Sequence, residues 1–236
     1  MKIIIAPTKQ MKFKDDFELP YTTPLFQQES ALLRKELSTL DPDTLKKTRK
    51  ISDRMLPKVY DLFHTKHPNR GCALLCYSGI AFQYMAPGIF TDEQLDYVNE
   101  HLRILSGLYG LVRPLDEIEE YRLEMQTKLP FSPGSLYTFW NKKIADALND
   151  EVILNLASEE YAKCIRPYKP LIDVRFLDAD GKEKGVYVKM ARGEMVRYMA
   201  ENKVERIEQI QKFDRQDFRF CPERSNETLY IFQKIK

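Results

Sequence analysis

The hydrophobic and polar positions of this chain follow two periods, and each period predicts one kind of element. Segments with apolar residues three or four positions apart are typical of helices that bury one face. The predicted helices span residues 26–40, 45–66 (two helices joined by a short turn), 91–101, 136–149, 158–163, 195–202 and 205–212. Short apolar runs rich in β-branched residues favour strands instead. The predicted strands span residues 2–6, 72–77, 103–106, 152–156, 171–177, 185–190, 218–221 and 229–232.

Turn and cap residues mark several boundaries of these elements. Asp41 precedes a proline at the start of a helix, and Thr91 precedes two acids at the start of another. The Asp180-Gly181 pair predicts a hairpin turn, and the polar, proline-containing residues 11–24 predict an irregular loop. Residues 72–77 are apolar throughout, which favours a central strand of a sheet.

The composition excludes several classes of protein. With 43% apolar residues among 236, the chain is too hydrophobic to be disordered and long enough for a sizeable core. No apolar stretch is long enough to span a membrane, and the first residues do not resemble a secretory signal, so we expect a soluble intracellular protein. Only nine glycines are present, and the glycine-rich motifs of dinucleotide-binding proteins and P-loop NTPases are absent.

No repeat or linker interrupts the chain. We therefore expect a single domain over residues 1–236, in the α/β class (mixed α+β), with helices around a mixed β-sheet. The sequence leaves the oligomeric state open, and a monomer is our expectation.

The charges are nearly balanced overall but unevenly distributed. The net charge is +2, which is not by itself typical of a nucleic-acid-binding protein. Residues 86–124 hold nine acids and three bases, whereas residues 161–236 hold seventeen bases and twelve acids. The two parts of the chain could therefore present faces of opposite sign.

Nucleophiles and metal ligands are sparse. With no export signal we expect four reduced cysteines that pack as small hydrophobic side chains. Three histidines favour neither a metal site nor a metal cofactor. Ser158 is followed by two glutamates, which resembles a helix cap more than a hydrolase nucleophile.

The densest group of cations lies in the predicted helix pair. Four basic side chains follow one another at intervals of four residues, so they could line up on one side of this two-helix segment, although Pro57 interrupts the register. They are Lys46, Lys50, Arg54 and Lys58. Such a row is typical of a solvated helix face, but it also suits a phosphate backbone, whose charges it would neutralise.

Two further groups of cations lie near the ends of predicted strands. Arg103 and Arg113 flank a Gly-Leu-Tyr-Gly sequence that resembles the hairpin of helix-hairpin-helix DNA-binding elements, with one extra residue. Lys189, Arg192 and Arg197 lie where a predicted strand leads through a glycine into a helix, a place that suits anions. Cations at such places also serve as structural salt-bridge partners or exposed turn residues, so both interpretations stay open.

Several motifs, in the same order along the chain, resemble those of one known family. The first two, Ala6-Pro-Thr-Lys9 and Lys50-Ile-Ser-Asp53, are similar to Ser-Pro-Ala-Lys and Arg-Ile-Ser-Asp. The most specific block runs from Leu102 through Arg113-Pro-Leu to Tyr121-Arg-Leu-Glu-Met125. It is followed by Leu136-Tyr-x-Phe-Trp140, Asn155-Leu-Ala-Ser158 and Ala191-Arg-Gly193. Over essentially its whole length the chain resembles the YaaA peroxide-stress protein family.

The resemblance carries several expectations. It implies a cytoplasmic bacterial protein that limits damage by hydrogen peroxide and lowers free intracellular iron, with no known catalysis and no cofactor. It also implies a single α/β domain called the cantaloupe fold, whose positively charged cleft and helix-hairpin-helix element bind duplex and branched DNA. Ala6 stands in place of the family Ser, and Lys50 in place of an Arg, which a lysine replaces poorly where a bidentate contact is needed.

Three functions are compatible with these residues. The first is largely sequence-independent DNA binding by a set of cations: Lys9, Lys46, Lys50, Arg54, Lys58, Arg103, Arg113, Lys189, Arg192 and Arg197. The second is an enzyme acting on a phosphorylated or nucleotide substrate in the same cleft, with Asp53, Asp116 or Glu124 as base. Direct iron binding is the least favoured, because paired metal-ligand motifs are absent.

The DNA-binding hypothesis makes a geometric prediction. Lys9, Arg103, Lys189 and Arg192 each lie at the end of a predicted strand. Because α/β sheets place their binding sites at strand ends, we expect these four side chains to converge on one cleft.

Overall fold

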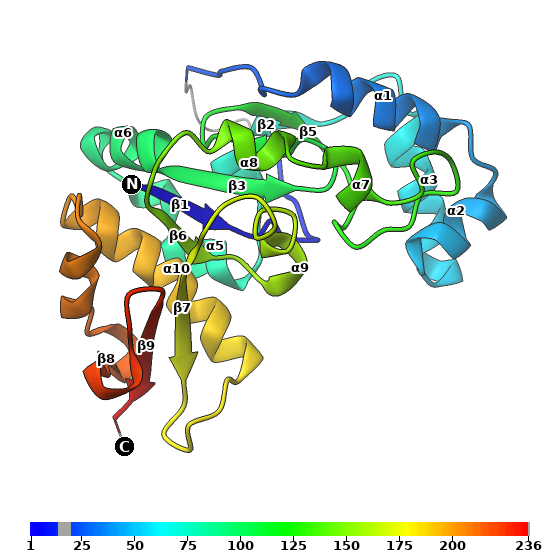
Figure 1. Cartoon of the computed structure of the whole chain (residues 1–236). Helices are drawn as coiled ribbons and strands as arrows, with labels where there is room; N and C mark the ends of the chain where they lie inside the picture. The colour runs from blue at the N-terminus through cyan, green and yellow to red at the C-terminus, as the bar shows by residue number, and fades with distance from the viewer. Residues whose placement is uncertain (14–19, 236) are drawn as a thin grey trace.

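A seven-stranded mixed sheet forms the centre of the fold in the computed structural model, which describes residues 1–13 and 20–235 (Figure 1). Its strand order is β4-β3-β1-β6-β7-β9-β8. The five inner strands run parallel, and they are β3 (Leu102–Ser106), β1 (Lys2–Ile5), β6 (Ile153–Leu156), β7 (Ile172–Leu177) and β9 (Leu229–Lys234). The edge strands β4 (Gly110–Val112) and β8 (Phe218–Phe220) are antiparallel to their neighbours. The mixed α/β class predicted from the sequence is confirmed.

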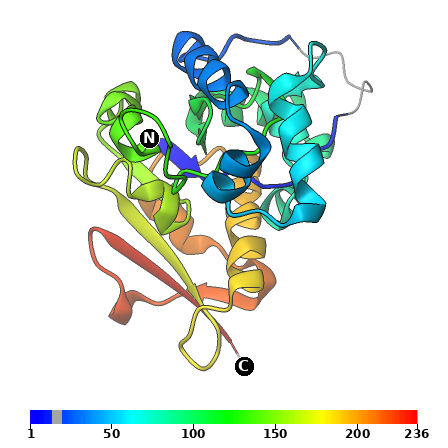
Figure 2. The ribbon, with the colours of Figure 1, turned by 90° about the vertical axis from the view of Figure 1, so that its right-hand side faces the viewer.

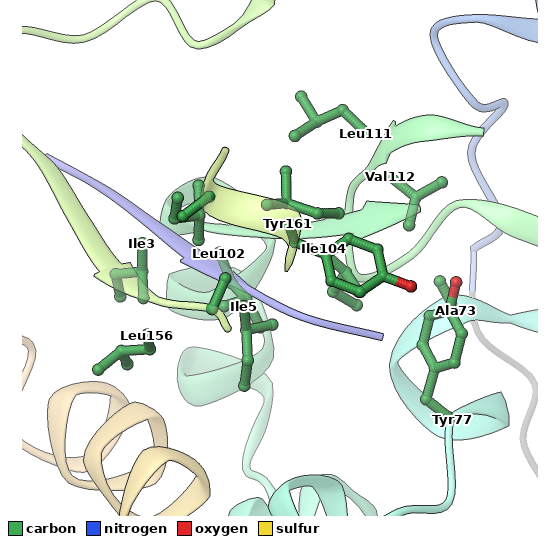
Figure 3. Close-up of a cluster of buried hydrophobic side chains, with 14 of the residues drawn as sticks. Ile3, Ile5, Ala73, Tyr77, Leu102, Ile104, Leu111, Val112, Leu156 and Tyr161 are labelled. Atoms are coloured by element: carbon green, nitrogen blue, oxygen red, sulfur yellow. The ribbon is translucent and has the colours of Figure 1, made fainter. Parts of the chain in front are cut away.

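The first strand is the middle of the core. Ile3, Ile4 and Ile5 are at most 1% exposed, because β1 has parallel neighbours on both edges and side chains packed on both faces. Figure 3 shows Ile3 and Ile5 among side chains from the neighbouring strands and from helices. A run of β-branched residues suits such a strand.

Helices cover the two faces of the sheet. On one side of the molecule α1 (Gln27–Ser38), α2 (Pro42–Arg49) and α3 (Leu56–His64) lie together (Figure 1). The long helix α10 (Gly185–Glu201) packs against α5 (Ile80–Met85) and α6 (Asp92–His101). Gly193 permits this contact, since a Cβ atom there would lie 1.9 Å from the carbonyl oxygen of Ala81.

The remaining elements are short. The helices α4 (Ala73–Cys76), α7 (Leu136–Trp140), α8 (Lys143–Ala147) and α9 (Glu159–Ala162) have four or five residues each. The 3₁₀ turns are η1 (Asp53–Met55), η2 (Pro87–Ile89), η3 (Ile207–Lys212), η4 (Arg215–Asp217) and η5 (Pro222–Arg224). A separate two-stranded sheet pairs β2 (Arg70–Cys72) with β5 (Glu117–Glu119).

Two helix starts agree with the cap residues found in the sequence. The Asp41 carboxylate accepts a hydrogen bond from the Thr44 backbone N–H at 3.0 Å, at the start of α2. Thr91 and Gln94 form a reciprocal capping box at the start of α6. Ser158 is the N-cap residue of α9, as predicted, but its side chain makes no cap hydrogen bond, so the capping box is not formed.

Residues 185–190 form the first turns of α10, not the predicted strand. Their valines and tyrosine favour a strand locally, but the buried positions Val188, Ala191, Met195 and Met199 continue one helical face through Gly193. Lys189 and Arg192 therefore project from a helix. The packing of α10 on α5 overrides the local propensity.

Other predicted elements also change. Residues 72–77 end β2 and form α4, because a short buried apolar run has no period that separates strand from helix. The helix predicted over 136–149 is broken at Asn141, whose φ of 44° and ψ of −129° are not helical. Asp180-Gly181 does form a turn, but it leads from β7 into α10, not into a paired strand.

The Gly-Leu-Tyr-Gly sequence is a β-hairpin turn between β3 and β4, so it is not a helix-hairpin-helix. Gly110 has a positive φ of 67°, and Trp140 packs against it so closely that a Cβ atom would lie 2.8 Å from the indole ring. The helix-hairpin-helix element implied by the resemblance is not confirmed. Of the loop predicted over 11–24, residues 14–19 lie outside the described residues.

Within residues 1–13 and 20–235, no helix has both the length and the apolar character needed to cross a bilayer.

Candidate functional site

A cavity of about 540 Å³ lies where β1 and β6 end. Its lining includes Ile5 to Gln10 from the end of β1, and Leu156 and Ser158 from the end of β6. In the sheet, β3 lies on one side of β1 and the later strand β6 lies on the other side. The direction in which strands are added therefore reverses at β1. Ligands of α/β proteins bind in the crevice at this place, outside the carboxyl ends of the strands.

Two walls enclose the cavity above the strand ends. One is formed by α5 with the residues before it and by α10, which contributes Lys189 and Arg192. The other is formed by residues 121–124 and by α9, which contributes Glu160 and Tyr161. Figure 2 shows the side of the molecule toward which β1 points, with α2 above and α10 below.

The charged residues that line the cavity are mostly basic. Four cations face two carboxylates, and they are Lys9, Arg122, Lys189 and Arg192 against Glu124 and Glu160. Burial raises the pKa of Glu160, and the neighbouring charge of Glu124 adds to the effect. This surplus of positive charge suits an anion.

Two buried donors at the cavity lack a partner. The Nε of Arg192 and the hydroxyl of Ser78 are inaccessible to solvent, and neither has a hydrogen-bond partner among the described residues. Burial lowers the pKa of Arg192, although Glu183 and Asp173 partly offset this. Because an unpaired buried donor costs about 1–3 kcal/mol, such groups are often satisfied by a ligand.

The Glu124 carboxylate connects the wall formed by residues 121–124 to α2. It accepts a hydrogen bond from Arg49 of α2 at 2.6 Å and one from the Nε of Arg122 at 3.3 Å, and Lys9 Nζ lies 4.0 Å away. Arg49 also donates to Thr127 at 3.0 Å. The buried Arg49 thus places α2 beside the cavity.

A chain of hydroxyl groups lies under the same wall. Tyr121, which lines the cavity, has its hydroxyl 2.7 Å from both the Tyr77 hydroxyl and the Ser106 hydroxyl. Burial raises the pKa of Tyr121 and of Tyr77, so both phenols keep their protons. Ser106 also accepts from the backbone N–H of Tyr109, which fixes the β3–β4 turn to this network.

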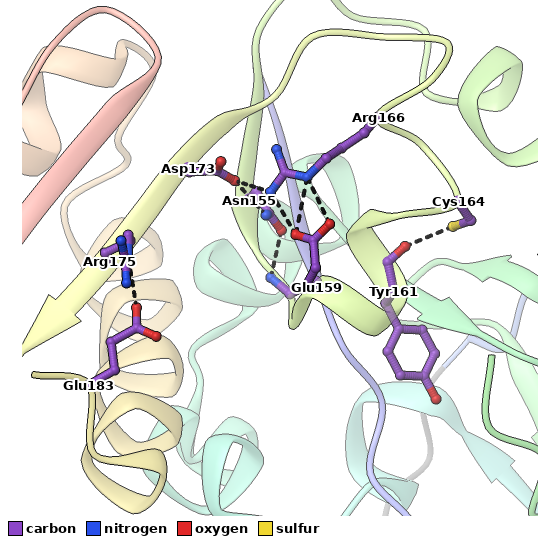
Figure 4. A network of polar contacts seen from close by, with 9 residues as sticks. Asn155, Glu159, Tyr161, Cys164, Arg166, Asp173, Arg175 and Glu183 are labelled. Carbon is purple, nitrogen blue, oxygen red and sulfur yellow. Dashed lines mark hydrogen bonds and ion pairs between the residues drawn. The ribbon is translucent and has the colours of Figure 1, made fainter. Parts of the chain in front are cut away.

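A polar network fixes the end of β6 beside the cavity (Figure 4). The Asn155 side chain accepts from the Ala157 backbone N–H at 2.9 Å and donates to Asp173 of β7 at 2.7 Å. Arg166 joins Asp173 to Glu159 of α9. The Asn155-Leu-Ala-Ser158 motif therefore orients the turn that carries Ser158 into the cavity lining.

Three of the four cations expected to converge do so. Lys9, Lys189 and Arg192 line the cavity, although Lys189 and Arg192 belong to a helix. Arg103 is not among the lining residues, because its guanidinium turns back to donate to the carbonyl oxygens of Asn99 and Leu102. For Arg103 the prediction is wrong.

Two other predicted cations are held by neighbouring carboxylates outside the cavity. Arg113 forms an ion pair with Asp116 at 3.0 Å, and Arg197 pairs with Glu201 at 2.7 Å. The structural salt-bridge interpretation thus describes both contacts. Whether either arginine also contacts DNA stays a prediction.

The basic row is divided among three elements and does not lie along one helix face. Lys46 lies in α2, Lys50 has a left-handed backbone after the helix end, Arg54 lies in η1 and Lys58 in α3. Lys46 pairs with Asp53, and Lys58 with Glu120 at 3.2 Å. In the part of the chain that the structure describes, Lys50 and Arg54 are exposed without an ion pair.

Sequence reasoning missed several residues of the site. The sequence patterns predict no binding or structural role for Arg49, Arg122 or Glu160 individually. The available signal for Arg49 was its position four residues after Leu45, on the buried face of α2. Nothing local distinguishes Arg122 and Glu160 from surface residues.

Metal and thiol chemistry have little support at this site. Among residues 1–13 and 20–235, no three His, Cys, Asp or Glu side chains group as metal ligands would. All four cysteines are unpaired thiols, and Cys72, Cys76 and Cys164 are buried. None of them lines the cavity.

Comparisons with known proteins place this chain among bacterial relatives over nearly its full length. A family model described as peroxide stress protein YaaA matches residues 1–224. The chain is 39% identical to a UPF0246 protein of Agathobacter rectalis, with 99% of each chain covered. It is 42% identical to UPF0246 protein LBA1843 of Lactobacillus acidophilus, with 99% of this chain and 97% of the relative covered. A UPF0246 protein of Desulfitobacterium hafniense is 40% identical, with 99% and 98% covered.

Proposed function

The chain belongs to the peroxide stress protein YaaA family, and we propose that it acts in the cytoplasm by binding DNA through the phosphate backbone at the cavity and along α2 and α3. The DNA would be duplex or branched, and the protein would help to limit iron-driven oxidative damage. The membership confirms the family expected from the motifs. DNA binding and the link to iron are the proposal.

One observation supports this proposal above all. The cavity has four cations against two carboxylates, and Arg49 attaches α2 to its wall. The exposed Lys50 follows Arg49 directly, and Arg54 lies in the next turn, so basic residues continue outward from the cavity. A concave basic surface of this kind focuses its field on an anionic ligand.

The expected mode of binding follows from the residue types. Lysine and arginine contacts to phosphates position a protein on DNA without reading the bases, so affinity should vary little with sequence. Each phosphate that is neutralised releases counterions, so the logarithm of affinity should fall with the logarithm of salt by roughly 0.9 per contact.

The test measures duplex and four-way-junction binding over a range of salt concentrations. The variant Lys50→Ala/Arg54→Ala should weaken binding to all sequences alike and flatten the salt slope by about one to two. The matched control is Lys182→Ala/Lys212→Ala, two exposed lysines outside the cavity lining, which should match the parent. If the parent protein binds neither DNA in low salt, the proposal is wrong. Unchanged DNA affinity in Lys50→Ala/Arg54→Ala would show that the end of α2 and η1 do not contact the DNA.

A second candidate function is an enzyme that acts on a phosphorylated or nucleotide substrate. It is favoured by Glu160, whose pKa is raised by burial and by the neighbouring Glu124 carboxylate in the cavity lining. Carboxyl groups in such unequal environments are typical of acid–base catalysis. Glu160→Gln should then abolish turnover of a phosphate ester while substrate still binds. Lack of turnover by the parent over a panel of phosphate esters and nucleotides would reject this candidate.

A further inference from the structure

The cavity is larger than a phosphate needs and differs in character from wall to wall. Its volume of about 540 Å³ falls in the range of roughly 300–1,000 Å³ that is typical of small-molecule sites. A DNA backbone that only crosses a basic surface would leave such a space unfilled. The cavity therefore has room for more of the ligand than its phosphate.

The α10 wall offers the cations that are free to bind an anion. Lys9 and Arg122 both lie near the Glu124 carboxylate, at 4.0 and 3.3 Å. Lys189 and Arg192 have no ion pair among the described residues, and the buried Nε of Arg192 has no acceptor. A phosphate group at this wall would be neutralised by both side chains.

The other wall and the strand ends suit a different part of the ligand. Glu124 and Glu160 present carboxylate oxygens, which accept hydrogen bonds from hydroxyl or amino groups. Between the walls, Ile5, Ile80 and Leu156 give an apolar lining. A ligand that is anionic at one end, flat and apolar in the middle, and rich in donors at the other end fits all three parts.

We propose that the cavity binds one nucleoside monophosphate unit, with its phosphate on Lys189 and Arg192. The base lies against the apolar lining, and its amino group or a sugar hydroxyl donates to the carboxylate wall. The unit has two possible sources, a free nucleotide or a nucleotide extruded from DNA. The second source rests on the proposed DNA-binding function, because a duplex is too wide for the cavity and only a single extruded nucleotide could enter it.

The first experiment uses free ligands and the whole chain. Calorimetric titrations compare dAMP, deoxyadenosine and inorganic phosphate. We expect dAMP to bind at least tenfold more tightly than either of the other two, because it occupies both the basic wall and the apolar lining. If inorganic phosphate binds as tightly as dAMP, the cavity is an anion site only, and the proposal is wrong. The proposal is equally wrong if dAMP does not bind.

Variants then locate the phosphate. Lys189→Ala removes an exposed side chain, so the fold should persist, and we expect about a tenfold loss of dAMP affinity with little change for deoxyadenosine. Arg192→Lys retains the charge but removes the Nε donor, and it should also weaken dAMP. The control is Lys212→Ala, an exposed lysine of η3 outside the cavity lining. Equal dAMP affinity in Lys189→Ala, Arg192→Lys and Lys212→Ala would overturn the assignment.

The second experiment separates the two sources. A duplex with 2-aminopurine opposite a mismatch gains fluorescence when the base leaves the stack. If extruded nucleotides enter the cavity, the protein should raise this fluorescence, and dAMP should reverse the rise. DNA binding without a fluorescence rise would retain the proposed function and exclude extrusion. Binding of dAMP without DNA binding would reject the proposed function and leave a free nucleotide as the ligand.

Discussion

Arg49 and Glu124, which are 75 residues apart in the chain, form an ion pair of 2.6 Å between α2 and the cavity wall. The Arg49 side chain is fully buried, and Glu124 is 13% exposed. Burial lowers the pKa of Arg49, and the Glu124 carboxylate offsets part of that effect. The pair therefore links the placement of the first helices to the shape of the candidate site.

Replacing Arg49 should destabilise the whole protein. Arg49→Met retains the apolar bulk but leaves Glu124 without its closest cation, and the loss of one partner of a buried pair costs about 3–5 kcal/mol. Urea unfolding followed by circular dichroism would measure the free energy of unfolding. Lys47→Met is the control, because Lys47 is exposed on the same helix, and a change within about 0.5 kcal/mol is expected there. Equal stability of the two variants would contradict the structural role of the pair.

Two glycines of α10 should respond oppositely to alanine. Gly193→Ala places a Cβ atom 1.9 Å from the Ala81 carbonyl oxygen, so α10 must move away from α5, at a cost of about 3 kcal/mol. Gly185→Ala at the start of the same helix meets no atom within 4 Å and should stabilise the protein by about 0.5 kcal/mol. Thermal unfolding measures both. A larger loss for Gly185→Ala than for Gly193→Ala would be incompatible with this helix packing.

The binding of anions should depend on the protonation of Glu160. Burial raises its pKa above the usual 4.5, so the folded protein binds this proton more tightly than the unfolded chain does. Its contribution to stability is therefore greatest at low pH and is lost as the pH rises from about 4.5 through the raised pKa. An anion in the cavity should bind more weakly over the same rise. Glu160→Gln should flatten both profiles, measured by thermal melts and by titration with dAMP, and unchanged profiles would count against this role.

The cysteines should differ sharply in reactivity. Burial raises the pKa of Cys76 and of Cys164 to about 12, and it also raises that of Cys72, so these three should react only after unfolding. Cys221 is half-buried and donates to the Glu223 carboxylate at 2.8 Å, which raises its pKa. Native labelling followed by mass spectrometry should modify Cys221 first, and Glu223→Gln should speed that reaction. Rapid labelling of Cys72 or Cys76 would show that the core opens.

The fold could be predicted where one local pattern had a single structural solution. The isoleucines of β1 fit only a strand buried on both faces, and Asp41 and Thr91 begin helices because each supplies an acceptor to free backbone N–H groups. Prediction failed where one pattern of apolar residues was compatible with both a strand and a helix. Residues 185–190 could form a strand or a helix, and the packing of α10 against α5 and α6 favours the helix.

The candidate site was predictable in part. Lys9, Lys189 and Arg192 stood out as cations near element ends, and they do line one cavity. Arg103 has the same residue type and also lies near an element end. Its guanidinium, however, donates to the carbonyl oxygen of Asn99 at the end of α6 and to that of Leu102 in its own strand. The direction of a long side chain depends on neighbours that are remote in sequence, so residue type and spacing could not separate Arg103 from the others.

The sequence by itself determined the family, the mixed α/β class, the buried first strand and most of the helix starts, because these depend on local patterns and on the order of motifs. Only the tertiary structure decided that Arg49 is buried against Glu124 and that β1 ends in a cavity lined also by residues of α5, α9 and α10. The physical reason is that strand order and helix packing bring together residues that are remote in the chain, such as Arg49 and Glu124, which are 75 positions apart. No spacing along the chain encodes which of their side chains will meet.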